Sequence, residues 1–234
     1  TILTNWYGII CYGSSKPYIA NNNISLDHWQ GIIVLTGSVP TIYNNTIENN
    51  TFGIDYYYSP LSLQTYDNII SNNEYGVWMW YAAPTIHNNT IANNSEYGVW
   101  LNRSSAPLIK ENDIIENYAG IWADDGSTPT IKDNDLLSFN RFGIVCMKNS
   151  DGLIEWNNIT SNIEVGVYIN GSSPNVRHNN ISATTIVNSH GKISDATIMS
   201  YGLIDRTAIE IRRKSMILMS SQEFDTRLGE PSIP

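Results

Sequence analysis

A repeat of 22 or 23 residues runs through most of this chain and limits the folds that it can adopt. Its clearest marker is a glycine that is followed each time by an aliphatic residue. These pairs are Gly8-Ile9, Gly31-Ile32, Gly53-Ile54, Gly76-Val77, Gly98-Val99, Gly120-Ile121, Gly143-Ile144 and Gly166-Val167. A fixed period of about 20 to 50 residues is the signature of repeat architectures, in which each unit stacks on its neighbours. The sequence therefore predicts about eight stacked units.

Three further columns recur at the same period. Proline follows most of the glycines, at Pro17, Pro40, Pro84, Pro107, Pro129 and Pro174. An asparagine column comes next, at Asn22, Asn45, Asn89, Asn112, Asn134, Asn157 and Asn179. We place Asp67 at the rung that this column would otherwise lack. An aliphatic residue stands two positions later, at Ile24, Ile47, Ile69, Ile91, Ile114, Leu136, Ile159 and Ile181.

Three short segments in each period alternate apolar and polar residues, as half-buried strands do. Gly, Asn, Ser and Pro separate these segments, and these residue types favour turns. A helical repeat needs longer segments, and Asn and Gly are poor helix formers. The sequence therefore predicts an all-β solenoid, a parallel β-helix with three parallel sheets. Its hand is expected to be right, because parallel crossovers are right-handed.

Three inward columns are expected to build the core. The first is Ile19, Ile42, Ile86, Ile109, Ile131, Ile154 and Val176. The residues after the glycines form the second, and those after the asparagine column form the third. Stacked Asn amides carry both donors and acceptors, so they can bond to one another and to the turn backbone. Asp67 has no donor when ionised, so its rung is expected to be weaker.

The repeat covers residues 1–182, and we expect residues 183–234 to form a degenerate coil and a C-terminal cap or tail. A solenoid needs a cap over its last apolar coil. The chain opens in mid-pattern at Thr1-Ile2, which we interpret as a mature product or a fragment. Cys11 and Cys146 lie six coils apart, about 29 Å at the spacing of strands. That separation is too long for a disulfide, so two buried thiols are expected.

Composition excludes several classes of function. Only 15% of the residues are charged and 41% are hydrophobic, so the chain is not a disordered acidic segment. The formal net charge of −9 argues against a nucleic-acid partner, which would need a basic face. No apolar run approaches the roughly 20 residues that a membrane-spanning helix needs.

With its Asn-Asn-x-Ile and Gly-Ile pattern, the repeat resembles the parallel β-helix proteins of the pectin-lyase-like superfamily. It is most similar to the carbohydrate-binding and sugar-hydrolysis (CASH) and NosD-type branches. The resemblance covers residues 1–182 and implies an extracellular or cell-surface protein. Several Asn-x-Ser/Thr sequences agree with secretion, and Asn102 and Asn170 are expected on outward loops. Because one fold hosts many activities, no catalytic residue is carried over.

The outward positions of the Gly-Ile strand form the candidate site. Trp78, Trp100 and Trp122 fall on successive coils and predict an exposed ladder, and a contiguous exposed apolar patch usually marks a binding surface. The other candidate residues border this ladder: Tyr57, Trp80, Asp55, Asn102, Asp124 and Tyr168. An indole face suits the apolar face of a sugar ring. Our first hypothesis is therefore a secreted or cell-surface protein that binds a polysaccharide or other glycan on its Trp ladder without cleaving it.

Two alternatives stay open. The first is a polysaccharide lyase or glycoside hydrolase on the same sheet, although a hydrolase needs two carboxylates about 5 to 9.5 Å apart. Asp124 and Asp125 are adjacent and would face opposite ways in a strand. A lyase would need a basic residue, and the outward column that offers a basic stripe lies on another sheet: His87, Lys110, Lys132, Glu155 and Arg177. The second alternative is a structural repeat segment of a larger surface protein, with the ladder buried in an assembly. Separately, stacked aromatics could serve only to stabilise the sheet through cross-strand contacts.

No metal or cofactor site is expected from the histidines, which lack paired ligand spacing. Calcium is the one ion that the sequence brings into consideration. Asp124, Asp125 and Asn102 could supply the oxygen ligands that Ca²⁺ prefers.

Overall fold

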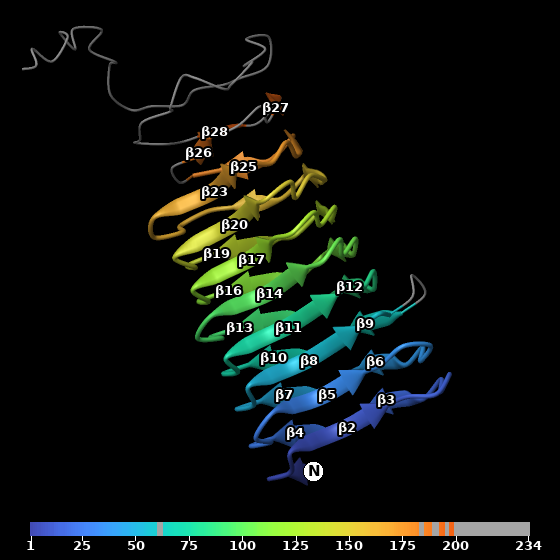
Figure 1. Cartoon of the computed structure of the whole chain (residues 1–234). Helices are drawn as coiled ribbons and strands as arrows, with labels where there is room; N and C mark the ends of the chain where they lie inside the picture. The colour runs from blue at the N-terminus through green and yellow to red at the C-terminus, as the bar shows by residue number, and fades with distance from the viewer. Residues whose placement is uncertain (60–62, 183–184, 189–191, 195–196, 199–234) are drawn as a thin grey trace, which may run out of the picture.

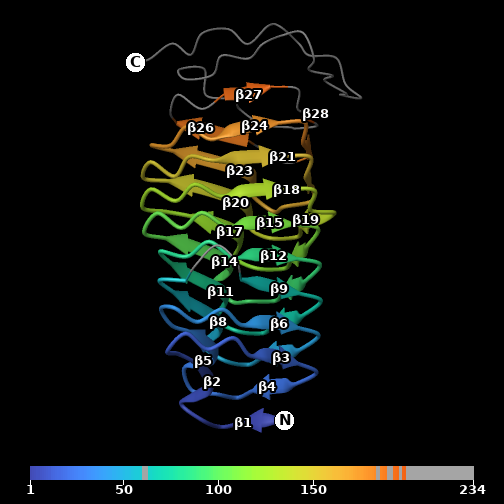
Figure 2. The same ribbon diagram turned by 90° about the vertical axis from the view of Figure 1, so that its right-hand side faces the viewer.

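The computed structural model describes residues 1–59, 63–182, 185–188, 192–194 and 197–198. These residues form a parallel β-solenoid whose coils stack from the N-terminus upward, as the sequence predicts (Figure 1). Turned by 90°, the stack shows the short strands that lie beside the longer ones in every coil (Figure 2). All strand pairs within the sheets are parallel.

The longest strands build a nine-stranded sheet that contains the glycine column, and we call it the glycine sheet. Its strands, in spatial order, are β2 (Tyr7–Cys11), β5 (Gln30–Val34), β8 (Phe52–Tyr57), β11 (Tyr75–Trp80), β14 (Tyr97–Asn102), β17 (Ala119–Ala123), β20 (Phe142–Met147), β23 (Val165–Asn170) and β26 (Thr185–Asn188).

A second nine-stranded sheet, which we call the proline sheet, is built of strands most of which start just after a proline. They are β3 (Tyr18–Ala20), β6 (Thr41–Tyr43), β9 (Gln64–Tyr66), β12 (Thr85–His87), β15 (Leu108–Lys110), β18 (Thr130–Lys132), β21 (Leu153–Glu155), β24 (Asn175–Arg177) and β27 (Lys192–Ser194).

A third sheet follows the asparagine column and is split into seven strands and three. The seven are β1 (Ile2–Leu3), β4 (Asn23–Ser25), β7 (Thr46–Glu48), β10 (Ile69–Ser71), β13 (Thr90–Ala92), β16 (Asp113–Ile115) and β19 (Leu136–Ser138). The three are β22 (Asn158–Ile159), β25 (Asn180–Ile181) and β28 (Thr197–Ile198). Because β22 packs beside β19, the short piece continues the line of the long one.

The three predicted inward columns form one continuous core, with two corrections in the third. Ile70 and Leu137 are fully buried there, whereas the predicted Ile69 is about half exposed and Leu136 is only partly buried. In the first column Thr65 occupies the rung between Ile42 and Ile86. Its hydroxyl is hydrogen-bonded to the buried hydroxyl of Tyr56, so this polar pair is satisfied inside the core.

The asparagine ladder runs along the corner between the proline sheet and the third sheet. In a typical rung, the Nδ2 of Asn89 donates to the Oδ1 of Asn112 at 3.0 Å and to two backbone carbonyls. The backbone N–H of Asn89 also donates to that Oδ1. The ladder therefore satisfies both the amides and the turn backbone, which is what a buried polar corner requires.

The rung that the sequence assigned to Asp67 belongs to Asn68. Asn45 donates to the Oδ1 of Asn68 at 3.0 Å, and Asn68 donates to that of Asn89 at the same distance. Asp67 lies one residue earlier in the left-handed region, with φ of 54° and its side chain exposed. The prediction was wrong because this stretch divides into separations of 23 and 21 residues instead of two of 22.

A second ladder, which the sequence analysis did not separate from the Asn-rich segment, lines the corner between the third sheet and the glycine sheet. Its members are Asn50, Asn73, Asn94, Asn117, Asn140 and Asn162. The third corner carries buried serines, most of them two residues before a proline. There the Oγ of Ser105 accepts from the backbone N–H of Ala82, and the Oγ of Ser150 accepts from that of Ser127.

Asp27 occupies the first position of the second ladder. Its Oδ1 accepts from the backbone and side-chain N–H groups of Asn5, but its Oδ2 is buried without a partner. An amide there could donate to the Oδ1 of Asn50, as the rungs above do. We expect Asp27→Asn to raise the free energy of unfolding by about 1–2 kcal/mol, the cost of a buried unsatisfied group. Urea unfolding would measure this, and an unchanged or lower midpoint would contradict it.

The two cysteines are free and buried, as predicted. They share one inward column, and six successive strand pairings connect Cys11 with Cys146. Burial raises the pKa of Cys11 to about 11 and that of Cys146 to about 12. Both thiols therefore stay protonated at neutral pH and behave as small apolar residues.

The predicted boundary at residue 182 and the C-terminal cap stay predictions, because most of residues 183–234 lie outside the described residues. Strands β26, β27 and β28 pair with β23, β24 and β25. Within the described ranges, the fold contains no helix with the length and apolar character needed to cross a membrane.

Candidate functional site

The predicted Trp ladder lies on the outer face of the glycine sheet. Strand register aligns Trp78 with Trp100 and Trp100 with Trp122 on successive rungs. Asp55 precedes them in the column, whereas buried Val145 separates Trp122 from Tyr168. The structure therefore brings the three indoles together and leaves Tyr168 two coils beyond them.

One face of each tryptophan is covered by a ring from a neighbouring column that the sequence analysis did not consider. This column is formed by the residue before each glycine, and its rings stack diagonally on the indoles. The pairs are Phe52–Trp78 at 5.0 Å, Tyr75–Trp100 at 5.2 Å and Tyr97–Trp122 at 4.9 Å between ring centroids. Trp78 also stacks on Trp100 at 5.5 Å. A sugar ring therefore has no open face of Trp78 on which to stack.

A more accessible group of rings lies where β8 and β11 end, and we call Tyr57, Tyr58, Trp80 and Tyr81 the strand-end patch. Tyr57 stacks on Trp80 at 6.2 Å, and Tyr58 stacks on Tyr81 at 4.9 Å. The two stacks meet at steep angles, 78° between Tyr57 and Tyr58 and 73° between Trp80 and Tyr81. The three tyrosines are 39–46% exposed.

Sequence reasoning found Tyr57 and Trp80 but missed Tyr58 and Tyr81. The signal was present, because two adjacent aromatic residues occur at the same offset from Gly53 and from Gly76. Both missed tyrosines adopt left-handed backbone angles, with φ of 50° and 51°. This conformation turns the chain at the strand end, so the rings leave the plane of the sheet's side chains.

Polar side chains border the strand-end patch on the next coils. Asn102 is the register partner of Trp80, and the guanidinium of Arg103 lies 5.0 Å from the centre of the Trp80 ring. Arg103 also pairs with Asp125 at 3.1 Å, and Asp124 pairs with Lys148 at 2.9 Å. The two carboxylates considered for calcium are thus already paired with cations. Among the described residues, no group of three His, Cys, Asp or Glu side chains is arranged to hold a metal ion.

Comparison with known families decides the classification. A family model described as a right-handed β-helix region matches residues 1–84 and 82–194. The chain belongs to the right-handed β-helix family. No curated protein and no solved structure gives a significant match. Membership is consistent with the pectin-lyase-like superfamily, and the narrower CASH or NosD relationship stays a prediction.

One carboxylate of this right-handed β-helix is buried on the outer face of the glycine sheet. Asp55 is only 2% exposed, so it cannot reach a ligand hydroxyl without movement of its neighbours. The Nε2 of Gln30 donates to its Oδ2 at 3.0 Å. The Oδ1 of Asp55 and the Oε1 of Gln30 are buried without partners. A proton on Asp55 would join these two oxygens in a cyclic acid–amide pair.

Burial raises the pKa of Asp55 from 3.8 to about 6, and the hydrogen bond from Gln30 opposes part of that rise. The folded state therefore holds this proton more tightly than the unfolded state. Its stabilising contribution is complete below about pH 4 and is lost as the pH rises through about 6. The loss is on the order of 2–3 kcal/mol, from the free energy of about 1.4 kcal/mol per pKa unit.

We expect Asp55→Asn to remove this pH dependence and to stabilise the protein at pH 8 by about 1–2 kcal/mol. An Asn side chain can accept from the Nε2 of Gln30 and donate to its Oε1 at every pH. Urea unfolding of both proteins at pH 5 and pH 8 would measure the difference. The exposed Asp113→Asn provides the control for removal of a negative charge. A variant that loses stability between these pH values as steeply as the parent protein would show that Asp55 is not the responsible group.

Proposed function

We propose that this right-handed β-helix is a secreted or cell-surface protein that binds a carbohydrate chain on the strand-end patch. The observation that carries the proposal is the perpendicular pair of aromatic stacks, formed by partly exposed rings beside polar side chains. Aromatic surface next to a few placed polar groups is the usual composition of a ligand site. Asn102 and Arg103 could bond to hydroxyl groups of a sugar whose apolar face lies on Tyr58 or Tyr81.

The inner tryptophans have a different role in this proposal. Trp78 and Trp100 are packed between aromatic neighbours and Trp122 packs on Tyr97, so they stabilise the contacts between coils. We expect Trp100→Ala to lower the free energy of unfolding by about 3 kcal/mol, the lower end of the range for truncation of a large buried aromatic, because Trp100 is partly buried. Glycan affinity of the folded variant should stay within twofold of the parent protein. A large loss of affinity at unchanged stability would instead make the ladder the binding surface.

The positions of the carboxylates favour glycan binding without cleavage. A glycosidase uses two of them about 5 to 9.5 Å apart, one protonated and one ionised. Of the three considered on this sheet, Asp55 is buried and Asp124 and Asp125 are in ion pairs. In the stripe on the proline sheet, Arg177 is paired with Glu155 and Lys132 with Asp133. Those two cations are therefore not free to act as the base of a lyase.

A tryptophan fluorescence titration against neutral and acidic polysaccharides tests the proposal, because Trp80 lies inside the patch. We expect a saturable change with at least one glycan and no release of reducing or unsaturated ends. The Tyr58→Ala/Tyr81→Ala variant should bind at least tenfold more weakly. Tyr18→Ala, which removes a strongly exposed tyrosine of the proline sheet, should bind normally.

Two results would reject this function. Full affinity in the double variant would exclude the strand-end patch as the site. The absence of saturable binding to every polysaccharide would favour a structural segment of a larger surface assembly. A molecular mass that increases with protein concentration would then support that second role.

A further inference from the structure

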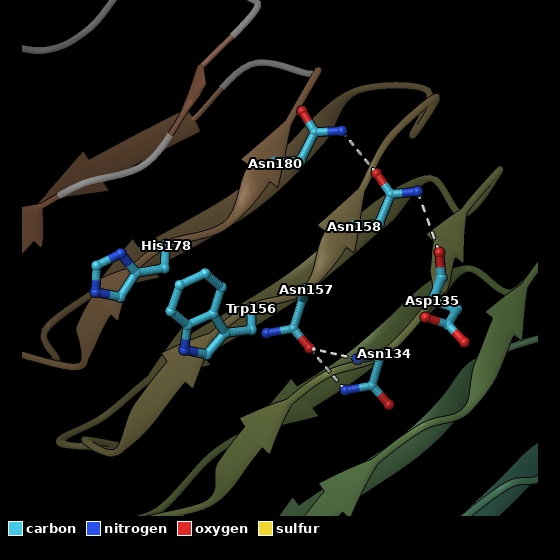
Figure 3. A pocket seen from close by; sticks show the side chains of 7 residues that line it. All are labelled: Asn134, Asp135, Trp156, Asn157, Asn158, His178 and Asn180. Atoms are coloured by element: carbon cyan, nitrogen blue, oxygen red, sulfur yellow. Dashed lines mark hydrogen bonds between the residues drawn. The ribbon is translucent and has the colours of Figure 1, made fainter. Parts of the chain in front are cut away.

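A shallow hollow of about 320 Å³ lies at the corner between the proline sheet and the third sheet (Figure 3). Trp156 and His178 form one wall, and Asp135, Asn158 and Asn180 form the other. Ladder asparagines lie between the two walls. In the order of the chain this corner follows the proline sheet, so it lies across the coil from the glycine sheet.

Trp156 is unusual for its place in the fold. It is 58% exposed and occupies a left-handed corner position, with φ of 57°. Polar residues hold the same corner in the other coils: Asn21, Asn44, Asp67, Asn88, Glu111, Asp133 and His178. A bulky residue with positive φ is uncommon, and this indole adds nothing to the buried core. More than half of its surface is therefore available to a ligand.

His178 holds the indole in a defined orientation. The two rings stack at 4.4 Å with an interplanar angle of 11°. One indole face is therefore covered by the imidazole, while more than half of the Trp156 surface stays open to solvent. An aromatic surface that is fixed before binding loses little conformational entropy when a ligand rests on it.

The opposite wall is a row of linked amides. The Nδ2 of Asn180 donates to the Oδ1 of Asn158 at 2.8 Å, and the Nδ2 of Asn158 donates to the backbone carbonyl of Asp135 at 3.1 Å. These bonds orient the row and use only part of its capacity, since each amide has two N–H groups and each oxygen has two lone pairs. Donors and acceptors thus alternate along the wall, with the exposed Asp135 carboxylate at its end.

We propose that this hollow is a second saccharide-binding site, with one sugar ring against Trp156 and its hydroxyls on Asn158, Asn180 and Asp135. Hydroxyl groups both donate and accept, so they match a wall of mixed amide groups and a carboxylate. This proposal depends on the residues of the hollow and not on the strand-end patch. If the proposed function of the strand-end patch also holds, the two sites lie at opposite ends of the proline-sheet strands and on different coils. The protein would then offer two separate glycan-binding sites.

The indole N–H resonances of the full 234-residue chain test this site separately from the first. The chain has seven tryptophans, and single Trp→Phe substitutions assign their signals. We would titrate the protein with four probes: the hexasaccharides of cellulose, xylan, chitin and polygalacturonate. We expect a saturable shift of the Trp156 signal with at least one probe. The shift should persist in Trp80→Ala and weaken at least fivefold in Asn158→Ala/Asp135→Ala.

A control and three outcomes make the result decisive. Phe139→Ala, which removes another exposed corner aromatic with positive φ, should leave the titration unchanged. A shift of Trp80 alone would overturn the second site and keep the proposed function. A shift of Trp156 alone would keep the second site and overturn the first. Unchanged signals for both tryptophans with all four probes would overturn both.

Discussion

Replacing Asn112 by leucine is expected to lower the free energy of unfolding by about 4 kcal/mol. The Nδ2 of Asn112 donates to the carbonyls of Ile86 and Lys110 and to the Oδ1 of Asn134. Its Oδ1 accepts two N–H groups of Asn89. Leucine has a similar size but leaves these buried groups without partners, and each such group costs about 1–3 kcal/mol.

The adjacent residue provides a matched control. Asp113 is exposed on β16, and its register partner in the next coil is Leu136. Asp113→Leu therefore also introduces a leucine, but at an outer position where the neighbouring coil already has Leu136. The free energy of unfolding should change by less than about 0.5 kcal/mol. Denaturant midpoints of the two variants give the comparison, and hydrogen exchange locates the affected coils. Equal midpoints would mean that the ladder adds little to stability.

Replacing Gly76 by alanine is expected to destabilise the protein by about 3 kcal/mol, the upper part of the usual range for overpacking. A Cβ atom at this position would lie 2.5 Å from the carbonyl oxygen of Gly98 in the next coil. It would also lie 2.9 Å from the Nδ2 of Asn94 and 3.0 Å from a methyl group of Ile91. A backbone atom and a ladder amide cannot move aside independently, so the coils themselves must separate.

Gly13→Ala separates this steric effect from the effect of backbone conformation. Gly13 has φ of 66°, and no atom lies within 4 Å of a Cβ placed there. Its replacement should cost only the strain of a left-handed alanine, roughly 1 kcal/mol. Thermal unfolding of both variants gives the measurement. If Gly76→Ala is no more destabilising than Gly13→Ala, the close approach of the coils does not require the glycine column.

The glycine column also explains why the fold could be predicted from one sequence. Every coil needs a small residue where the coils approach closely and a buried amide at the ladder corner. Because these requirements recur at the same position in each coil, they appear in the sequence as a period. The Gly, Pro and Asn columns together predicted three parallel sheets, the inward rows and the buried thiols. A feature that is repeated eight times tolerates an error in any one coil, and this is why the misplaced Asp67 did not affect the predicted architecture.

Where two neighbouring residues suit the same rung, the period does not determine which of them occupies it. Asp67 and Asn68 could both fill a corner, and only the hydrogen bonds from Asn45 and to Asn89 select Asn68. The second ladder was hidden for the same reason. Asn49 and Asn50 are adjacent, yet the first turns the chain with φ of 57° and the second is buried in the ladder.

The sequence by itself determined the solenoid, the direction in which most strand residues point and the rows that the tryptophans share. Tertiary structure alone decided which of those outward residues can be reached. Trp78 is covered by Phe52 from the preceding coil and Asp55 is buried, whereas Tyr58 and Tyr81 are exposed because the chain turns there. The physical reason is that a period specifies which residues stack directly, while exposure depends on diagonal neighbours and on the turn at each strand end.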